Sequence, residues 1–213
     1  MIDFSRNYFN IMSVEVNNSE SLQEMDSEIN QKVLKWNNNL QSGQEGTLKM
    51  PLNTPVRLPG SENDDLLVIE YSAKLSNRGT APLMQLCFAD KNGNSITEKN
   101  YETAFLRKNI NNSGIHMAVG SEWKWELIKK SDGSSLPSSE LAKRYFEYKY
   151  VISGDGTYRF FIKDNNLFST WYEPFKESVL YIKNPTAGLN TPEYFTGFKN
   201  RALYENIDGK TSE

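Results

Sequence analysis

The sequence has little of what catalytic and metal-binding sites are usually built from. A single cysteine, Cys87, and a single histidine, His116, stand among 213 residues. Cys87 has no partner for a disulfide within the chain, and its apolar, strand-like surroundings favour a buried small hydrophobe over a reactive thiolate. One histidine excludes the familiar zinc spacings, and the segment around it carries no nucleophile motif.

Long apolar runs and basic clusters are also absent. No window holds about 18 consecutive apolar residues, so we predict no membrane-spanning helix. The formal net charge is −3, and no basic stretch is dense enough to follow a phosphate backbone, so we do not expect nucleic acid as a partner. The opening "MIDFSRNYFN" lacks the apolar core of a secretory signal, so we expect either synthesis in a cytoplasm or a signal that was removed and replaced by a start methionine.

What the chain does have is a recurring alternation of apolar and polar residues. In "RYFEYKYVIS" (144–153) the alternation puts Phe146, Tyr148 and Tyr150 on one face, which is the period of a strand with one buried face. Further strands are predicted in "IMSVEV", "KVLKW", "LLVIEYSAKLS", "APLMQLCFAD", "EWKWELIKK", "GDGTYRFFIKD" and "ESVLYIKNP". So many short strands with turns between them predict an all-β fold, a β-sandwich of jelly-roll type with long loops over residues 1–185.

At most one or two short helices are expected. Near-helical spacing of Met25 and Ile29, after a capping-box pattern, predicts a short helix or a loop at 20–30. "PSSELAKRYF" predicts one helical turn before its strand. The pair Asn92-Gly93 predicts a type I′ hairpin turn, which needs positive φ at both central residues.

Aromatic residues make up 12% of the chain, and they gather in the loop "NLFSTWYEPFKE" (166–177). A Trp or Tyr ring stacks on the apolar C–H face of a sugar, while amides and carboxylates bind its hydroxyls. Core packing is the alternative, and it is favoured for Trp123 and Trp125, which share a strand face. Surface exposure is favoured for Trp171 and Tyr172. The candidate ligand-binding residues are Trp171, Tyr172, Trp123, Trp125, Tyr148, Tyr150 and Glu173.

Residues 186–213 differ in composition from the strands before them. Threonine, proline and glycine separate isolated aromatic residues there, which is typical of an extended tail that docks onto a partner through its rings. The candidate docking residues are Tyr194, Phe195, Phe198 and Tyr204. We therefore expect a homo-oligomer or a component of a larger assembly.

Paired carboxylates are the remaining route to catalysis. Glycosidases place two carboxyl groups about 5–9 Å apart across a sugar. Glu173 with Glu177, or Glu122 with Glu126, is such a neighbouring pair beside aromatic residues. Neighbours of this kind arise by chance among 27 acidic residues, so we predict no catalytic residue and no enzyme.

Calcium is the one cofactor that two loops suggest. "DKNGNS" (90–95) has its glycine at the wrong position for an EF-hand, and a hairpin turn explains these residues better. "SENDDL" offers Glu62, Asp64 and Asp65 as carboxylate ligands, but a solvated acidic loop is the preferred interpretation. A structural calcium is thus an open alternative, and we predict no cofactor and no metal site.

The order of strands resembles the CBM4/9-like carbohydrate-binding jelly-roll modules. The matching pieces are Glu70 to Ser76, Asp90 to Gly93, Tyr145 to Ser153, Gly156 to Lys163 and Val179 to Lys183. Where these modules usually have an acid in the last strand, this chain has Lys183 and Asn184, which removes a ligand from any calcium of the family type. Such modules occur in tail, baseplate and adsorption proteins of bacteriophages of Gram-positive hosts, and the resemblance implies a virion protein.

The leading expectation is therefore a non-catalytic phage tail or baseplate protein. It would attach to host cell-wall saccharide or hold a neighbouring virion protein, without a membrane and without nucleic acid. One alternative is a purely structural subunit that docks through its C-terminal tail. The other is a glycosidase or polysaccharide lyase that uses paired carboxylates.

Overall fold

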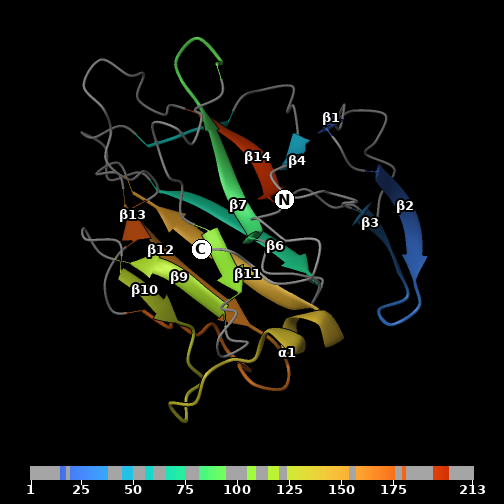
Figure 1. Cartoon of the computed structure of the whole chain (residues 1–213), viewed down its shortest axis with the longest axis vertical. Helices are drawn as coiled ribbons and strands as arrows, with labels where there is room; N and C mark the ends of the chain where they lie inside the picture. The colour runs from blue at the N-terminus through green and yellow to red at the C-terminus, as the bar shows by residue number, and fades with distance from the viewer. Residues whose placement is uncertain are drawn as a thin grey trace, which may run out of the picture.

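The computed structural model describes residues 15–17, 20–37, 45–49, 56–59, 66–74, 82–94, 105–108, 115–119, 124–153, 157–175, 179–180 and 194–201. Within these ranges the protein is all-β, as expected, with antiparallel pairing throughout and one short helix. The strands form two main sheets and a separate hairpin (Figure 1).

A four-stranded antiparallel sheet carries most of the buried aromatic residues. Its order is β13-β12-β11-β6, with bounds Val179–Leu180, Thr157–Lys163, Phe146–Ile152 and Leu67–Ala73. β11 is the clearest case of the predicted alternation, because Phe146, Tyr148 and Tyr150 are buried while the residues between them are partly exposed. The predicted strand faces are confirmed here, since side chains in a strand point alternately to the two faces of a sheet.

The larger sheet has eight strands in the order β1-β4-β14-β7-β8-β9-β10, with β5 also pairing with β14. The bounds are Glu15–Asn17 (β1), Glu45–Lys49 (β4), Tyr194–Arg201 (β14), Pro82–Ala89 (β7), Phe105–Lys108 (β8), Ile115–Val119 (β9), Lys124–Leu127 (β10) and Val56–Arg57 (β5). Cys87 lies in β7 and is half-buried.

β14 corrects the expectation of an extended tail for the part of 186–213 that is described. It lies inside the larger sheet, with β4 on one side and β7 on the other. Phe195 packs its ring edge against Phe88 of β7, with centroids 6.3 Å apart, and contacts the core. A strand so late in the chain pairs here with segments more than a hundred residues earlier, which no local pattern reveals. The positions on either side of β14 lie outside the described residues.

A separate hairpin replaces the helix or loop expected at 20–30. β2 (Glu20–Asp26) pairs with β3 (Gln31–Asn37) along its whole length. The turn between them is closed by the Asp26 carboxylate, which accepts a hydrogen bond from the Glu28 amide at 2.8 Å, and Asn30 takes a positive φ of 50°. Met25 and Ile29, the expected apolar helix face, are exposed.

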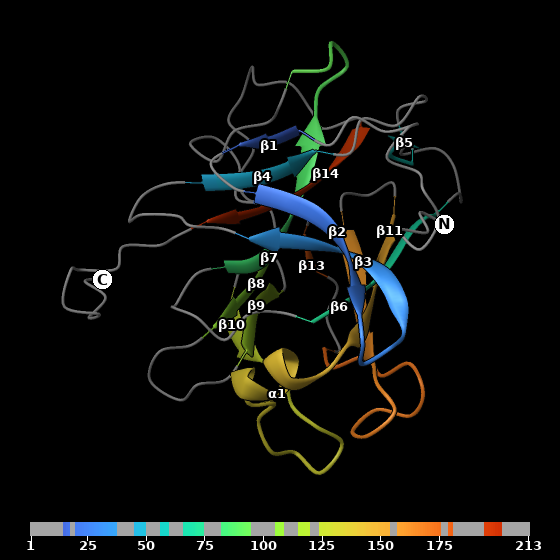
Figure 2. The ribbon, with the colours of Figure 1, turned by 90° about the vertical axis from the view of Figure 1, so that its right-hand side faces the viewer.

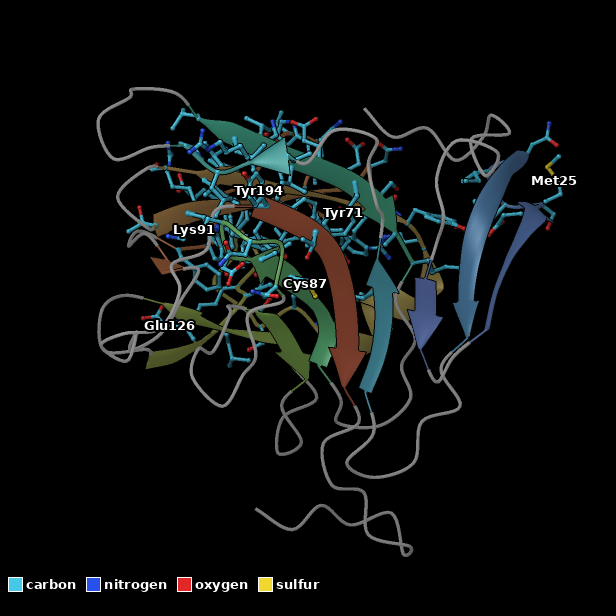
Figure 3. All side chains as sticks on the ribbon, turned by 90° about the horizontal axis from the view of Figure 1, so that it is seen from above. Met25, Tyr71, Cys87, Lys91, Glu126 and Tyr194 are labelled. Atoms are coloured by element: carbon cyan, nitrogen blue, oxygen red, sulfur yellow. The ribbon has the colours of Figure 1, made fainter. Side chains whose placement is uncertain are left out.

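The hairpin is attached to the four-stranded sheet at its tip. The Tyr145 hydroxyl donates to the Asp26 carboxylate, and the Lys74 ammonium donates to Glu28 at 2.7 Å. Figure 3 shows Met25 on this hairpin, set apart from the side chains gathered between the two main sheets, where Tyr71 lies.

The predicted helical turn is confirmed as α1 (Ser138–Lys143), which lies at one end of the molecule (Figure 2). The turn at Asn92-Gly93 is not the predicted type I′, because Gly93 has a positive φ of 81° but Asn92 does not. Instead the Gly93 amide donates to the Asp90 carbonyl, and the Asp90 amide donates to the Asn94 carbonyl, so the loop has three residues. Three-residue hairpin loops place their left-handed residue last, where glycine is free of strain.

Both main sheets contribute to one apolar core, which gives the fold its sandwich-like character. Leu86 and Phe88 of β7 are 1% exposed, and they belong to the same cluster as Tyr148 and Phe160 of the four-stranded sheet. Each fully buried apolar side chain of this size contributes about 1.5–3 kcal/mol to stability. No helix in the described ranges is long and apolar enough to cross a membrane.

Candidate functional site

The aromatic loop after β12 begins at a buried carboxylate. Asp164 is 4% exposed. Its Oδ1 accepts hydrogen bonds from the amides of Leu167 and Phe168, each at 2.8 Å, and its Oδ2 accepts one from Arg144 Nε at 2.7 Å. Burial raises the pKa of Asp164, but these hydrogen bonds outweigh it and hold the pKa below its usual value of 3.8. The carboxylate therefore fixes the path of the chain as it leaves the sheet.

Three rings of the loop anchor it to the core. Phe168 and Phe175 are each 4% exposed, and Tyr172 stacks on Phe168 with ring centroids 4.9 Å apart. The backbone of Tyr172 also pairs with Ile162 of β12 through two hydrogen bonds of 2.9 Å. The surface exposure favoured for Tyr172 is thus wrong for most of its ring, which packs inward.

Trp171 points to the opposite side from Tyr172. Its ring faces the ammonium groups of Lys149, 4.1 Å from the ring centroid, and of Lys163, at 5.6 Å. These lysines lie on the outer face of β11 and β12, because their strand neighbours Tyr148 and Ile162 are buried. Trp171 is half-buried there, and each contact of this kind is worth about 0.5–1 kcal/mol at an exposed site.

We call this surface the Trp171 face, and it combines two aromatic rings with three ion pairs. It consists of Trp171 and Phe161 with six charged side chains, namely Glu70, Glu147, Lys149, Arg159, Lys163 and Glu173. Lys149 lies opposite Glu70 in the pairing of β11 with β6 and bonds it at 2.7 Å. Lys163 lies opposite Glu147 and bonds it at 3.0 Å. Strand register therefore sets both ion pairs.

The third ion pair joins the loop to β12. Arg159 donates from Nε to Glu173 Oε1 at 2.7 Å and from Nη2 to Oε2, which is a bidentate arrangement. The same guanidinium lies over the Phe161 ring, 5.0 Å from its centroid. Glu173 is thus a predicted site residue that does lie on the same face as Trp171, and Arg159 holds it in place.

Two predicted ligand-binding residues are wrong. Tyr148 is 0% exposed and Tyr150 is 1% exposed, and both belong to the core. Burial raises the pKa of both phenols. A strand face rich in aromatic residues is compatible with a binding platform, but this face is the one that packs against the larger sheet.

The other predicted residues lie either in strands of the larger sheet or outside the described part of the chain. Trp125 lies in β10 opposite Ala118, and its side chain is outside the described part of the structure. Tyr194 and Phe195 are half-buried in β14, and Phe198 lies opposite Leu86 in the same sheet. The remainder, Trp123, Tyr204, Glu122 and Glu177, are outside the described residues.

The two calcium loops have different outcomes. Asp90 is 1% exposed, and its carboxylate accepts hydrogen bonds from the amides of Asn92 and Asn94 at 2.8 and 2.9 Å, so it serves the hairpin turn. The acidic loop with Glu62, Asp64 and Asp65 is not among the described residues. In the described part of the chain no group of three potential metal ligands comes together.

Sequence reasoning did not identify Lys149, Lys163, Arg159 and Phe161 as site residues. The signal was present, since the same alternation that buries Tyr148 and Tyr150 turns Lys149 to the other face. What the sequence did not show is that the loop after β12 folds back along that strand and brings Trp171 over the lysines.

Compared with protein-family models, with curated proteins and with solved structures, the chain gives no significant match. The chemistry of the Trp171 face must therefore be inferred from its own geometry. A half-buried indole surrounded by charged hydrogen-bonding groups is a surface for a ligand with both apolar and polar sides.

Proposed function

We propose that this protein is a non-catalytic β-sandwich of jelly-roll type that binds saccharide on the Trp171 face. The observation that carries the proposal is the placement of Trp171, which the loop holds against Lys149 at 4.1 Å on the outer side of the sheet. The sequence resemblance to carbohydrate-binding modules supports the same function.

The chemistry of sugars fits this surface. A pyranose ring has an apolar C–H face that stacks on an indole, and its hydroxyls both donate and accept hydrogen bonds. Carboxylates such as Glu147 accept those bonds, and ammonium groups such as Lys163 donate them. Because both kinds of group stand around Trp171, a sugar can satisfy its hydroxyls without leaving the indole.

The test is binding of the full chain to a glycan array and to cell walls of Gram-positive bacteria. The Trp171→Ala variant should lose at least about fivefold in affinity, since stacking of a ligand ring on an aromatic side chain is worth about 1–3 kcal/mol. Trp171→Phe should retain part of the binding because a ring remains. Met25→Ala, on the hairpin and 59% exposed, is the control at a residue outside the Trp171 face. Equal retention of the unaltered chain and all three variants would refute the assignment of the site.

A place in a phage tail or baseplate is the second part of the proposal. It rests on the sequence resemblance to carbohydrate-binding modules alone. Mass spectrometry of phage particles from a lysed culture would test it. Presence of the chain in purified particles supports the proposal, and its restriction to the soluble lysate contradicts it.

One observation favours the alternative of a structural assembly subunit. Leu66, just before β6, and Val68, within it, are 57% and 50% exposed, and large exposed apolar side chains are common at interfaces between subunits. Deleting residues 186–213 would remove β14 from the larger sheet, so it does not test docking cleanly. Val68 has the same strand parity as Glu70 and so lies on the same outer side of the sheet. Val68→Glu is the sharper variant: loss of oligomers in sedimentation would favour the assembly function.

The enzymatic alternative is tested at the loop carboxylates. Glu173 is held by both of its oxygens to Arg159, which suits a positioned structural carboxylate. Turnover of a host polysaccharide that disappears in Glu173→Gln or Glu177→Gln would promote a glycosidase or lyase over the binding function.

A further inference from the structure

The charges on the Trp171 face are balanced pair by pair. Three cations and three carboxylates occupy it, and each cation bonds one carboxylate, so the formal charge of the face is zero. The pairs are spread over the face, because Arg159 and Lys163 stand four residues apart on β12, about 13 Å along the strand. Among the described residues of the face, a ligand therefore meets these charges as ion pairs.

The charges around the indole are also layered. Lys149 and Lys163, which contact Trp171, have side chains 20% and 28% exposed, whereas their partners Glu70 and Glu147 are 40% and 44% exposed. In both pairs the glutamate side chain is thus the more exposed partner. An anionic group that approaches Trp171 meets negative charge first, and like charges brought into contact repel.

Arg159 is the most exposed cation of the face, with a side chain 55% exposed against 29% for Glu173. Its bidentate bond to Glu173 occupies two of its donors, and its guanidinium lies over Phe161. An anion that bound there would have to compete with a charge-assisted bidentate pair.

We infer that the Trp171 face selects uncharged saccharides and rejects anionic wall polymers, which deepens and rests on the saccharide-binding function proposed above. The paired charges act as hydrogen-bonding groups for hydroxyls. The outward carboxylates Glu70 and Glu147 are the residues that determine specificity, since they keep anions away from the ring.

The probes are two neutral hexasaccharides, of N-acetylglucosamine and of β-1,3-linked glucose, and two polyanions, polygalacturonate and poly(glycerol phosphate). Binding to the full chain is measured by calorimetry at about 0.1 M and about 1 M salt, between which the Debye length falls from about 10 Å to about 3 Å. We expect binding of at least one neutral probe, with less than about a threefold change in affinity between the two salt concentrations. Neither polyanion should bind.

A double variant tests the role assigned to the carboxylates. Glu70→Gln with Glu147→Gln removes two negative charges from a face whose formal charge is zero, and it keeps the shape of both side chains. It should gain polyanion binding that disappears at about 1 M salt. Glu126→Gln, at an exposed carboxylate on β10 of the larger sheet, makes a matched change away from the face and should gain nothing.

The outcomes distinguish failure of the selectivity for uncharged saccharides from failure of the saccharide-binding function itself. Salt-sensitive binding of a polyanion by the unaltered chain, lost in Trp171→Ala, would overturn the selectivity and leave the saccharide function in place. Absence of polyanion binding in the folded double variant would also contradict the role of Glu70 and Glu147. Failure of all four probes and of the glycan array would remove the saccharide function itself. Circular dichroism of each variant establishes that it is folded.

Discussion

Replacing Asp164 by asparagine should destabilise the protein more than any change to the exposed ion pairs. Asparagine keeps an acceptor for the amides of Leu167 and Phe168 but turns an NH₂ group toward Arg144 Nε, so a donor faces a donor. Arg144 then loses its carboxylate partner on this side and keeps the bond to Glu140 at 2.6 Å.

The size of the expected stability loss follows from the burial of the Asp164–Arg144 ion pair. Breaking a buried ion pair by removing one partner costs about 3–5 kcal/mol. The Asp164 side chain is 1% exposed, but that of Arg144 is 19% exposed and retains Glu140, so we expect a lower figure of about 2–3 kcal/mol. With a urea m-value of about 2 kcal/mol/M, the midpoint should fall by about 1–1.5 M.

Urea unfolding followed by tryptophan fluorescence measures this change. Glu147→Gln is the control, because the Glu147–Lys163 pair is partly exposed and such pairs are worth about 0–1 kcal/mol. If both variants lost the same small amount, the buried carboxylate would not hold the loop as reasoned. A loss of stability without any change in saccharide binding would separate the anchor from the position of Trp171.

Three other features lead to predictions of their own. Hydrogen bonds hold the pKa of Asp164 below its usual 3.8, so the carboxylate contributes its full stabilisation above pH 3.8 and loses it as the pH falls through the lower, folded-state pKa. The difference in unfolding free energy between the protein and Asp164→Asn should therefore shrink over that acidic range, which urea titrations at successive pH values would measure. Tyr148 Oη is buried with no hydrogen-bond partner among the described residues, so Tyr148→Phe should stabilise the protein by about 1 kcal/mol, and a loss of stability would point to a partner for the hydroxyl. Gly93 and Gly133 share a φ of 81°, and no atom lies within 4 Å of where a β-carbon would stand, so alanine at either should cost about 1–2 kcal/mol from the backbone alone, and clearly unequal thermal midpoints would contradict that cause.

The sequence predicted which side chains share a face, but it did not predict what each face meets. Alternation in β11 correctly grouped Phe146, Tyr148 and Tyr150, and then left two possibilities for a row of aromatic side chains. The ligand interpretation was wrong because the decisive fact is the position of β7, more than fifty residues earlier, whose Leu86 and Phe88 share the core with that row. Burial depends on this long-range packing, which local periodicity does not contain.

The hairpin shows the same limit for a helical pattern. The spacing of Met25 and Ile29 is equally compatible with a helix and with a strand that continues into a turn. Pairing of β2 with β3 decides between them, because it bonds the backbone groups that face each other across the hairpin while leaving these two side chains exposed. Short segments with mixed signals are resolved by such pairing.

The opposite orientations of Trp171 and Tyr172 bear on how a loop can bind a ligand. Because Tyr172 pairs with Ile162 like a strand residue, its ring turns inward and the ring before it turns outward. The residues that fix this register are Asp164, Phe168 and Phe175, all of them buried. For the proposed saccharide binding, Trp171 would therefore need little ordering, because the entropy that a free loop would lose on binding is already lost in folding. The buried residues on either side of a surface ring would in this way contribute to its affinity.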